Sequence, residues 1–291
     1  MSDLRPRRSV LYMPAANERA LEKAKTLPAD AIIFDLEDAV APDAKPAARP
    51  NAVAAAGSSE YGNRELTIRC NGLDTPWGAD DLAAAATSGA SAVVIPKVGS
   101  VAYLDEISAR LTAAGAPESL KIWAMIETPT AIFDVRSIAA HPRVAVLVMG
   151  TNDLARELRS SLGAAGRHPL VPHLATALAA AREFGKVILD GVYNDVRDPD
   201  GFAVEAAQGA EMGFDGKTLV HPTQVEPANA AFSPSADEVE YSRRVIEAFE
   251  QGLAEGKGVI TVDGRMIENL HVDNARRAIA IADAIAALSD S

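Results

Sequence analysis

The sequence lacks several common features, and each absence excludes a class of protein. Cys70 is the single cysteine among 291 residues, so the chain cannot form an internal disulfide. Such cysteine usage indicates a reducing compartment, and we expect a cytoplasmic protein. No apolar stretch reaches the length of about 18 residues that a transmembrane helix requires. The opening residues, MSDLRPRRSV, also lack the apolar segment of a signal peptide.

Basic residues are outnumbered as well. The chain has 28 Lys and Arg against 40 Asp and Glu, which gives a net charge of −12 at pH 7. This balance argues against nucleic acid or an anionic membrane as the main partner. An anionic small ligand would therefore need a local cluster of basic side chains. Cysteine and histidine spacings typical of zinc sites are absent too.

The sequence does contain a regular alternation of short apolar runs and amphipathic helical segments. The eight runs are residues 9–13, 31–36, 66–70, 92–96, 122–127, 144–150, 187–189 and 216–220. Alternating strands and helices predict a parallel sheet. Eight units in roughly 220 residues are typical of a (β/α)₈ TIM barrel. An open doubly wound sheet would carry a glycine-rich turn after its first strand. That position reads MPAANER, without glycine, so the barrel is favoured.

A tail follows the last predicted strand. Residues 236–252 and 272–288 each have the spacing of an amphipathic helix, and Asp263-Gly264 between them is a strong hairpin signal. We therefore expect a catalytic barrel domain, residues 1–232, and a helix–hairpin–helix extension, residues 233–291. The extension is either an arm that packs on a neighbouring subunit or padding at the bottom of the barrel, and periodicity alone does not choose between them.

Charged residues stand where the predicted strands end, which is where barrel active sites lie. In chain order they are Glu37 and Asp38, Arg69, Lys97, Glu127, Asp153, Asp190 and His221. Carboxylates that converge without a counter-charge take up protons, and a divalent cation removes this conflict. Ligation by oxygen alone suits Mg²⁺, with Mn²⁺ as a second possibility. The sequence predicts Glu127 and Asp153 as metal ligands, with Glu37 and Asp38 holding metal-bound waters.

Simpler interpretations exist for each of these residues. Glu127 or Asp153, taken alone, is more simply a helix N-cap. Arg69 lies inside a strand, so it needs a carboxylate partner, either structural, such as Glu37, or from a substrate. Lys97 and Lys217 are expected to be solvated or salt-bridged.

Two further candidates have ordinary interpretations as well. His221 is more simply a hydrogen-bonded rim residue than a catalyst, and Cys70 is more simply a strand residue than a nucleophile. A metal and Arg69, without a Schiff-base lysine or a Ser or Cys nucleophile, indicate enolate chemistry: C–C cleavage next to a carbonyl, or its reverse.

Nine motifs resemble those of a known family. In order they are RSVLYMPA, AIIFDLEDAV, IRCNG, VIPKV, MIETP, GTNDLA, DGVYND, GFDGKTLVHP and VDGRMIENLH. They cover nearly the whole chain and are similar to the citrate lyase β-subunit-like (HpcH/HpaI aldolase/citrate lyase) family, which includes malyl-CoA lyases. WGADDL, MGTNDLA and ENLHV are most similar to its (3S)-malyl-CoA thioesterase branch.

The resemblance implies a TIM barrel that binds Mg²⁺ and a CoA-thioester substrate, assembles as a homotrimer or hexamer, and closes each site with a neighbour's C-terminal arm. The implied metal ligands are Glu127 and Asp153. Arg69 would hold substrate oxygens. The other expected contacts are Glu37 and Asp38 at the metal waters and Gly150 and Thr151 at the substrate. The CoA phosphates would need basic partners, and Arg19, Lys23 and Lys97 are the candidates because of their placement near the rim.

The arm departs from the family pattern at one position. The family usually has Asp after a GxMI segment, whereas here GRMI is followed by Glu268. The expected reaction is hydrolysis of (3S)-malyl-CoA-type 3-hydroxydicarboxylic thioesters to malate and CoA, with Glu268 activating water. One alternative is a lyase that cleaves malyl-, methylmalyl- or citramalyl-CoA to acetyl- or propionyl-CoA plus glyoxylate or pyruvate. Another is a citrate lyase β-type subunit, with an acyl-carrier-protein thioester.

Overall fold

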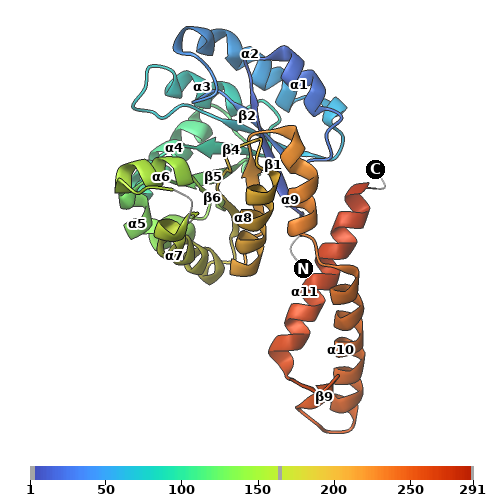
Figure 1. The fold of residues 1–291 in the computed structure, drawn as a ribbon. Helices are drawn as coiled ribbons and strands as arrows, with labels where there is room; N and C mark the ends of the chain where they lie inside the picture. The colour runs from blue at the N-terminus through green and yellow to red at the C-terminus, as the bar shows by residue number, and fades with distance from the viewer. Residues whose placement is uncertain (1–3, 163–165, 290–291) are drawn as a thin grey trace. The chain divides into compact units, whose positions relative to one another are not determined.

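The computed structural model describes residues 4–162 and 166–289 (Figure 1). Two compact units make up this chain. One comprises residues 7–232, and the other comprises residues 233–289 together with residues 4–6. They are called the barrel unit and the C-terminal unit below.

The barrel unit is built on eight parallel strands that close on themselves in chain order. β8 pairs with β1, which completes the ring. The strands are β1 Ser9–Pro14, β2 Ala31–Asp35, β3 Glu65–Arg69, β4 Ala92–Ile95, β5 Lys121–Ile126, β6 Val144–Met149, β7 Val187–Asp190 and β8 Gly216–Leu219. The predicted (β/α)₈ barrel is confirmed.

Helices follow the strands around the outside of the ring (Figure 1). They are α1 Glu18–Ala24, α2 Lys45–Ala56, α3 Gly78–Ala85, α4 Val101–Ala113, α5 Pro129–Ala140, α6 Thr151–Leu158, α7 Val171–Glu183, α8 Pro199–Met212 and α9 Val225–Ala231. Short 3₁₀ turns are η1 Pro42–Ala44, η2 Ser59–Tyr61, η3 His168–Leu170 and η4 Pro222–Gln224.

The starts of α5 and α6 show that neither candidate metal ligand is a helix cap. Thr128 caps α5, because its hydroxyl accepts a hydrogen bond from the Ala131 N–H, 3.1 Å away. Gly150 is the N-cap of α6, and Asp153 lies inside the first turn. The N-cap interpretation is therefore wrong for both Glu127 and Asp153, and both carboxylates are available for other roles.

Strand alternation separates two apolar layers. Ile33, Trp123 and Val148 belong to a cluster of residues that fills the barrel. Ile32 and Phe34, which flank Ile33 in the sequence, belong to the layer between strands and helices. Because successive strand side chains point to opposite faces, the same rule decides which residues at the strand ends face the barrel mouth.

Asp190 illustrates the rule, because it ends β7 on the helix-facing side. Its predecessor Leu189 is part of the interior cluster. Asp190 is fully buried and pairs with Lys217 Nζ at 3.0 Å and with Arg167 Nη1. Lys217 Nζ also contacts Glu205 Oε1 on α8, 2.7 Å away. Burial alone would raise the pKa of Asp190, but the two cations outweigh it and lower that pKa. Asp190 therefore holds α8 to the barrel and does not join the acids of the mouth.

The C-terminal unit has the expected helix–hairpin–helix order. It consists of α10 Ala236–Ala254, β9 Ile260–Val262, β10 Arg265–Ile267 and α11 Asn269–Ser289. β9 and β10 pair antiparallel through a turn in which Asp263 and Gly264 have φ of 48° and 76°. Two positive φ values are the geometry that an Asp-Gly hairpin turn favours. Phe249 and Val272 belong to a separate small apolar core in this unit.

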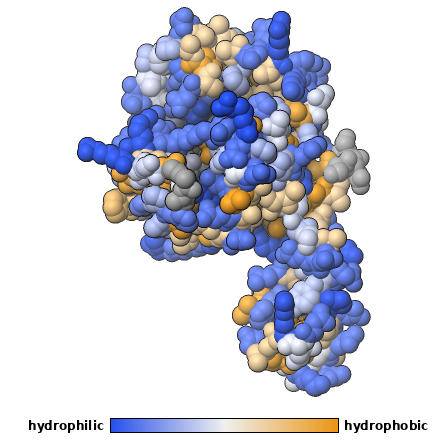
Figure 2. Space-filling model, in the orientation of Figure 1, coloured by the Kyte–Doolittle hydropathy of each residue, from blue (hydrophilic) through white to orange (hydrophobic). Residues whose placement is uncertain are grey.

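In the part of the chain that the structure describes, no helix is both long and apolar enough to cross a membrane. The face of the barrel unit shown in Figure 2 is mainly hydrophilic, with apolar residues scattered over it.

Replacing Lys217 with Met should destabilise the barrel unit by about 3–5 kcal/mol, because it leaves the buried carboxylate of Asp190 short of a counter-charge. Urea unfolding followed by circular dichroism measures the effect. Lys257→Met is the matched control, because Lys257 forms an exposed ion pair with Glu255 and its loss should barely move the midpoint. Equal midpoints for the two variants would contradict this role of Lys217.

Candidate active site

A cavity of about 320 Å³ opens at the carboxyl ends of the barrel strands. Apolar side chains such as Met125, Met149 and Val220 form part of its wall. Other lining residues come from four strand ends, those of β2, β3, β5 and β6: Asp35, Asp38, Arg69, Glu127, Gly150, Thr151 and Asp153. Six of the ten predicted site residues outside the arm therefore line one cavity.

Arg69 is buried and bound on two sides by carboxylates. Its Nε and Nη2 donate to the two oxygens of Asp35 at 2.7 and 2.6 Å. Its Nη1 lies 2.8 Å from Glu37 Oε2. The guanidinium also stacks over the ring of Tyr12, 4.7 Å from the ring centre. Glu37 is thus confirmed as a structural partner of Arg69, and the stronger, bidentate partner is Asp35.

Sequence reasoning missed Asp35, although the sequence held a signal for it. Asp35 follows Ala31 and Ile33 at two-residue spacing, and both of these fill the barrel interior. Parallel pairing of β2 with β3 sets Asp35 opposite Arg69. Counting the inward-facing positions from the strand start would have found this pair.

The loop that carries Glu37 and Asp38 is fixed by hydrogen bonds to its backbone. Asp35 accepts from the Glu37 N–H at 2.9 Å and from the Ala39 N–H at 3.1 Å. Lys45 Nζ donates to the carbonyl oxygen of Glu37 at 2.6 Å. The predicted acidic pair therefore stands on a rigid turn, and Lys45 is a supporting residue that the sequence did not reveal.

Glu127 is the most strongly perturbed acid of the mouth. Only 2% of it is exposed, and the Lys97 N–H donates to its Oε1 at 2.7 Å. Burial, followed by the nearby charge of Glu37, raises the pKa of Glu127 to about 8. Gly150 is needed opposite, because a β-carbon there would overlap the carboxylate of Glu127. A buried acid with this pKa needs either a proton or a cation near neutral pH.

Asp153 supplies the second carboxylate. It lines the cavity with Glu127, and Arg156 Nη1 lies 2.7 Å from its Oδ1. The described residues contain no cluster of three or more His, Cys, Asp or Glu side chains placed to hold a metal ion. A cation here would thus have two protein carboxylates and would complete its shell with water, an arrangement that Mg²⁺ accepts. The donor set therefore fits Mg²⁺.

Lys97 has a strained backbone, with φ of 51°. A residue other than glycine in this left-handed region costs of order 1–3 kcal/mol. Its Nζ lies 3.3 Å from Glu37 Oε1, so it is salt-bridged, as expected. Burial would lower the pKa of Lys97, but Glu37 and Glu127 outweigh it and raise that pKa. Lys97 and Glu37 also line a second cavity of about 330 Å³.

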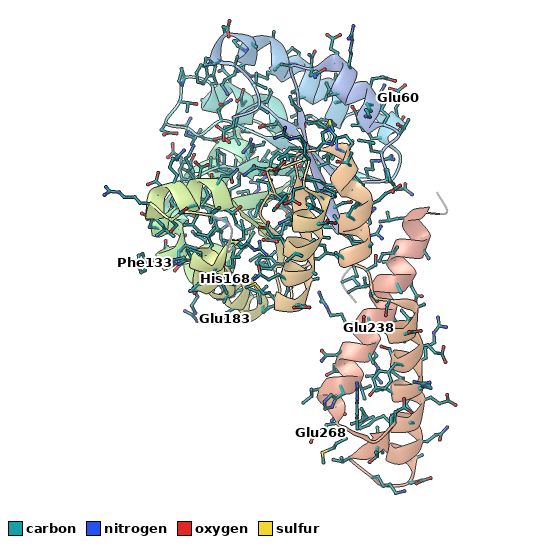
Figure 3. The ribbon with its side chains drawn as sticks, in the orientation of Figure 1. Glu60, Phe133, His168, Glu183, Glu238 and Glu268 are labelled. Atoms are coloured by element: carbon teal, nitrogen blue, oxygen red, sulfur yellow. The ribbon has the colours of Figure 1, made fainter. Side chains whose placement is uncertain are left out.

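Other predicted residues lie outside the main cavity. Arg19 and Lys23 are exposed on α1 and are not among the described residues that line it. Glu268 belongs to the C-terminal unit, beside the hairpin where α11 begins (Figure 3). His221 Nδ1 lies 2.8 Å from the Thr223 hydroxyl, as expected of a rim residue. Cys70 directly follows β3 and is buried, which raises the pKa of its thiol and disfavours a nucleophilic role.

Two asparagines of the cavity wall were also missed. Asn152 and Asn194 donate to each other's amide oxygens at 3.1 and 2.7 Å, and both line the cavity. They stand in the motifs GTNDLA and DGVYND, but nothing in either motif indicates that the two side chains meet. The pair joins the turn after β6 to the turn after β7.

The geometry defines a class of protein. A TIM barrel whose mouth combines a buried arginine with converging carboxylates is suited to stabilising negative charge on the oxygens of a small substrate. The carboxylates can hold a divalent cation, and the arginine can donate hydrogen bonds to an anionic oxygen.

The chain belongs to the HpcH/HpaI aldolase/citrate lyase family, which matches residues 8–222. A (3S)-malyl-CoA thioesterase of Cereibacter sphaeroides (strain KD131 / KCTC 12085) is 50% identical over 286 residues, which are 98% of each chain. An L-malyl-CoA/beta-methylmalyl-CoA lyase of Rhodobacter capsulatus is 34% identical over 90% of each chain. The family resemblance predicted from the motifs is confirmed, and so is the prediction of an enzyme.

A solved structure is similar over nearly the whole chain. It is the protein CitE from Mycobacterium tuberculosis in complex with magnesium, acetoacetate and coenzyme A. The TM-score is 0.79 at 29% sequence identity, covering 97% of this chain and 100% of the other.

The stability of the metal-free protein should fall as the pH rises from about 5 to about 8. Glu127 has a pKa raised from 4.5 to about 8 in the fold, so over this range the folded state binds more protons than the unfolded state, and rising pH favours unfolding. Urea midpoints measured in the presence of a chelator test this. Glu127→Gln resembles the protonated acid, so its midpoint should fall less. An equal fall in both proteins would contradict the raised pKa.

Proposed function

We propose that the protein is a Mg²⁺-dependent hydrolase of (3S)-malyl-CoA and similar 3-hydroxydicarboxylic thioesters. The observation that carries this proposal is the meeting of Glu127, Asp153 and Arg69 in one barrel-mouth cavity. The likeness to a thioesterase over 98% of the chain supports the choice of reaction. The magnesium and coenzyme A in the CitE complex support the choice of metal and thiol carrier.

Each residue of the mouth has a role in this proposal. Glu127 and Asp153 would hold Mg²⁺, which would supply Lewis-acid polarisation of substrate oxygens. Arg69 donates hydrogen bonds to the oxyanion, since Asp35 and Glu37 hold its guanidinium in place.

The remaining mouth residues orient substrate and water. Glu37 and Asp38 would accept hydrogen bonds from water bound to the cation. Gly150 and Thr151 are assigned to the substrate. Gly150 also leaves room for the Glu127 carboxylate, which a β-carbon at this position would overlap.

The CoA phosphates need positive charge, which is scarce in this acidic chain. Arg19 and Lys23 are assigned to them, with Lys97 as the third predicted contact. Both side chains of the first pair are exposed on α1, which follows the first barrel strand. These assignments rest on placement near the rim and on exposure.

Glu268 is assigned to the site of a neighbouring subunit in a homotrimer or hexamer. Two apolar side chains near it support a covered position in the assembly: Met266 is 64% exposed and Leu270 is 55% exposed within this chain. In that position the Glu268 carboxylate would accept a proton from the attacking water. We assign residues 233–291 to this arm on the same grounds.

A C–C lyase is the second candidate. The lyase relative favours it, and so does the set of Arg69, Glu127 and Asp153, which also suits an enolate. In that reaction Glu268 would transfer the proton to or from the α-carbon of the acetyl group. Its side chain is one methylene longer than the aspartate that the family usually has there, and this favours hydrolysis.

Incubating the purified protein with malyl-CoA and Mg²⁺ should release free thiol and malate, with no glyoxylate. Chelation of the metal should abolish the release. Thiol reagent and keto-acid assays distinguish the products. Acetyl-CoA and glyoxylate in equal amounts would establish the lyase reaction instead.

Replacing Asp153 with Ala should lower Mg²⁺-dependent turnover by more than about 100-fold, because loss of outer-shell partners alone commonly costs 10–100-fold. The fold should persist by circular dichroism. Asp200→Ala is the matched control, since Asp200 is an exposed acid in the first turn of α8. Normal turnover by the Asp153 variant would refute its role as a ligand.

Exchanging Glu268 for Asp should shift the products towards C–C cleavage, because the shorter side chain withdraws the carboxylate from the attacking water. The ratio of free thiol to keto acid, measured on malyl-CoA, reports the shift. Glu255→Asp, elsewhere in the C-terminal unit, serves as the control. An unchanged ratio would remove the argument from side-chain length.

A further inference from the structure

We propose that Lys97 is a positioning residue that ties Glu37 to Glu127, and that its left-handed backbone makes this double contact possible. This inference rests on the proposed function and differs from the assignment of Lys97 to a CoA phosphate. It concerns how the acids of the mouth keep their geometry.

Two contacts from one residue carry the proposal. The Lys97 N–H donates to Glu127 Oε1 at 2.7 Å, and the Lys97 Nζ lies 3.3 Å from Glu37 Oε1. Glu37 in turn contacts Arg69 Nη1 at 2.8 Å through its other oxygen. Lys97 therefore connects the acid beside the arginine with the acid assigned to the metal.

The backbone conformation is the second observation. Lys97 is one of three residues other than glycine with positive φ among the described parts of the chain, and its φ is 51°. The others, Arg159 and Asp263, end a helix and form a hairpin turn, where such values are common. Lys97 lies in the turn after β4, directly after Pro96, and lines the second cavity together with Glu37. Strain retained at such a place indicates a functional constraint.

The Lys97 side chain is partly exposed, and its ammonium reaches the buried carboxylate of Glu37. Glu37 is buried, and burial raises its pKa, so it benefits from a second cation in addition to Arg69. The described residues offer Glu37 two cations at contact distance, Arg69 and Lys97. Removal of Lys97 would leave one Glu37 oxygen without its cation.

A stability comparison tests the backbone half of the proposal without any activity. Lys97→Gly and Lys97→Ala both remove the ammonium and keep the N–H. At a left-handed position the glycine variant should melt higher by roughly 2 °C or more, because alanine is strained there and glycine is not. At an ordinary position alanine would be the more stable, and that order would overturn the proposal.

Metal binding provides a second readout independent of turnover. Mn²⁺ titration followed by electron paramagnetic resonance should give Lys97→Met a dissociation constant within about threefold of the wild type, because its backbone N–H still holds Glu127. A tenfold or larger loss of affinity would show that the position of Glu127 depends on the Lys97 ammonium and not on its N–H, contrary to the proposal.

Kinetics on two substrates separate positioning from phosphate binding. Lys97→Met should lower kcat by about tenfold or more on malyl-CoA and equally on the malyl thioester of pantetheine, which lacks the CoA phosphates of the nucleotide. Lys97→Arg, which retains the cation, should recover most of the loss. A rise in KM confined to malyl-CoA, with kcat unchanged, would identify a phosphate ligand and overturn the proposal.

The proposed function and the proposal for Lys97 can be refuted independently. Absence of turnover of either thioester by the wild-type protein would defeat the proposed function. The melting order of the glycine and alanine variants and the Mn²⁺ affinities would still decide on Lys97.

Discussion

Four carboxylates converge on one buried guanidinium at the barrel mouth. Asp35 and Glu37 contact Arg69 directly, and Glu127 and Asp153 line the same cavity. Burial and the nearby charge of Glu37 raise the pKa of Glu127 to about 8, and Arg69 offsets this only in part. The unbalanced charge makes the mouth receptive to a divalent cation, and this property connects the fold with the proposed chemistry.

The neighbouring cations maintain this imbalance rather than remove it. Lys45 donates to the backbone of the acidic turn and contacts no carboxylate oxygen at hydrogen-bond distance among the described residues. Lys97 reaches Glu37 but offers Glu127 only a neutral N–H. Lys217 forms an ion pair with Asp190 on the helix-facing side of the strands. Positive charge thus helps to fix the geometry of the mouth. Of the two carboxylates assigned to the metal, Asp153 pairs with Arg156, whereas Glu127 accepts a hydrogen bond from a neutral N–H.

The chemistry divides between the two units of the chain in the function proposed here. The barrel unit contains the strand-end cavity. In this unit Asp35 holds Arg69 in place, and Gly150 leaves room for the Glu127 carboxylate. The C-terminal unit holds Glu268 between its hairpin and α11. If Glu268 activates water on an element separate from the metal ligands, one barrel could support either hydrolysis or C–C cleavage. The side chain that the arm places at the site would decide between the two reactions.

The sequence by itself determined the barrel, the strand positions within a residue or two, the helix–hairpin–helix tail and most acids of the mouth. Periodicity and strand ends are local signals, so one chain is enough to recognise them. The tertiary structure decided what each charge does. Asp35 and Asp190 are the last residues of β2 and β7, yet Asp35 faces the barrel interior and binds Arg69, whereas Asp190 faces α8. Whether a strand-end side chain points into the barrel or towards the helices depends on the register of its strand in the closed ring. The contacts of Lys97 depend on the positive φ of its backbone, which the folded turn imposes.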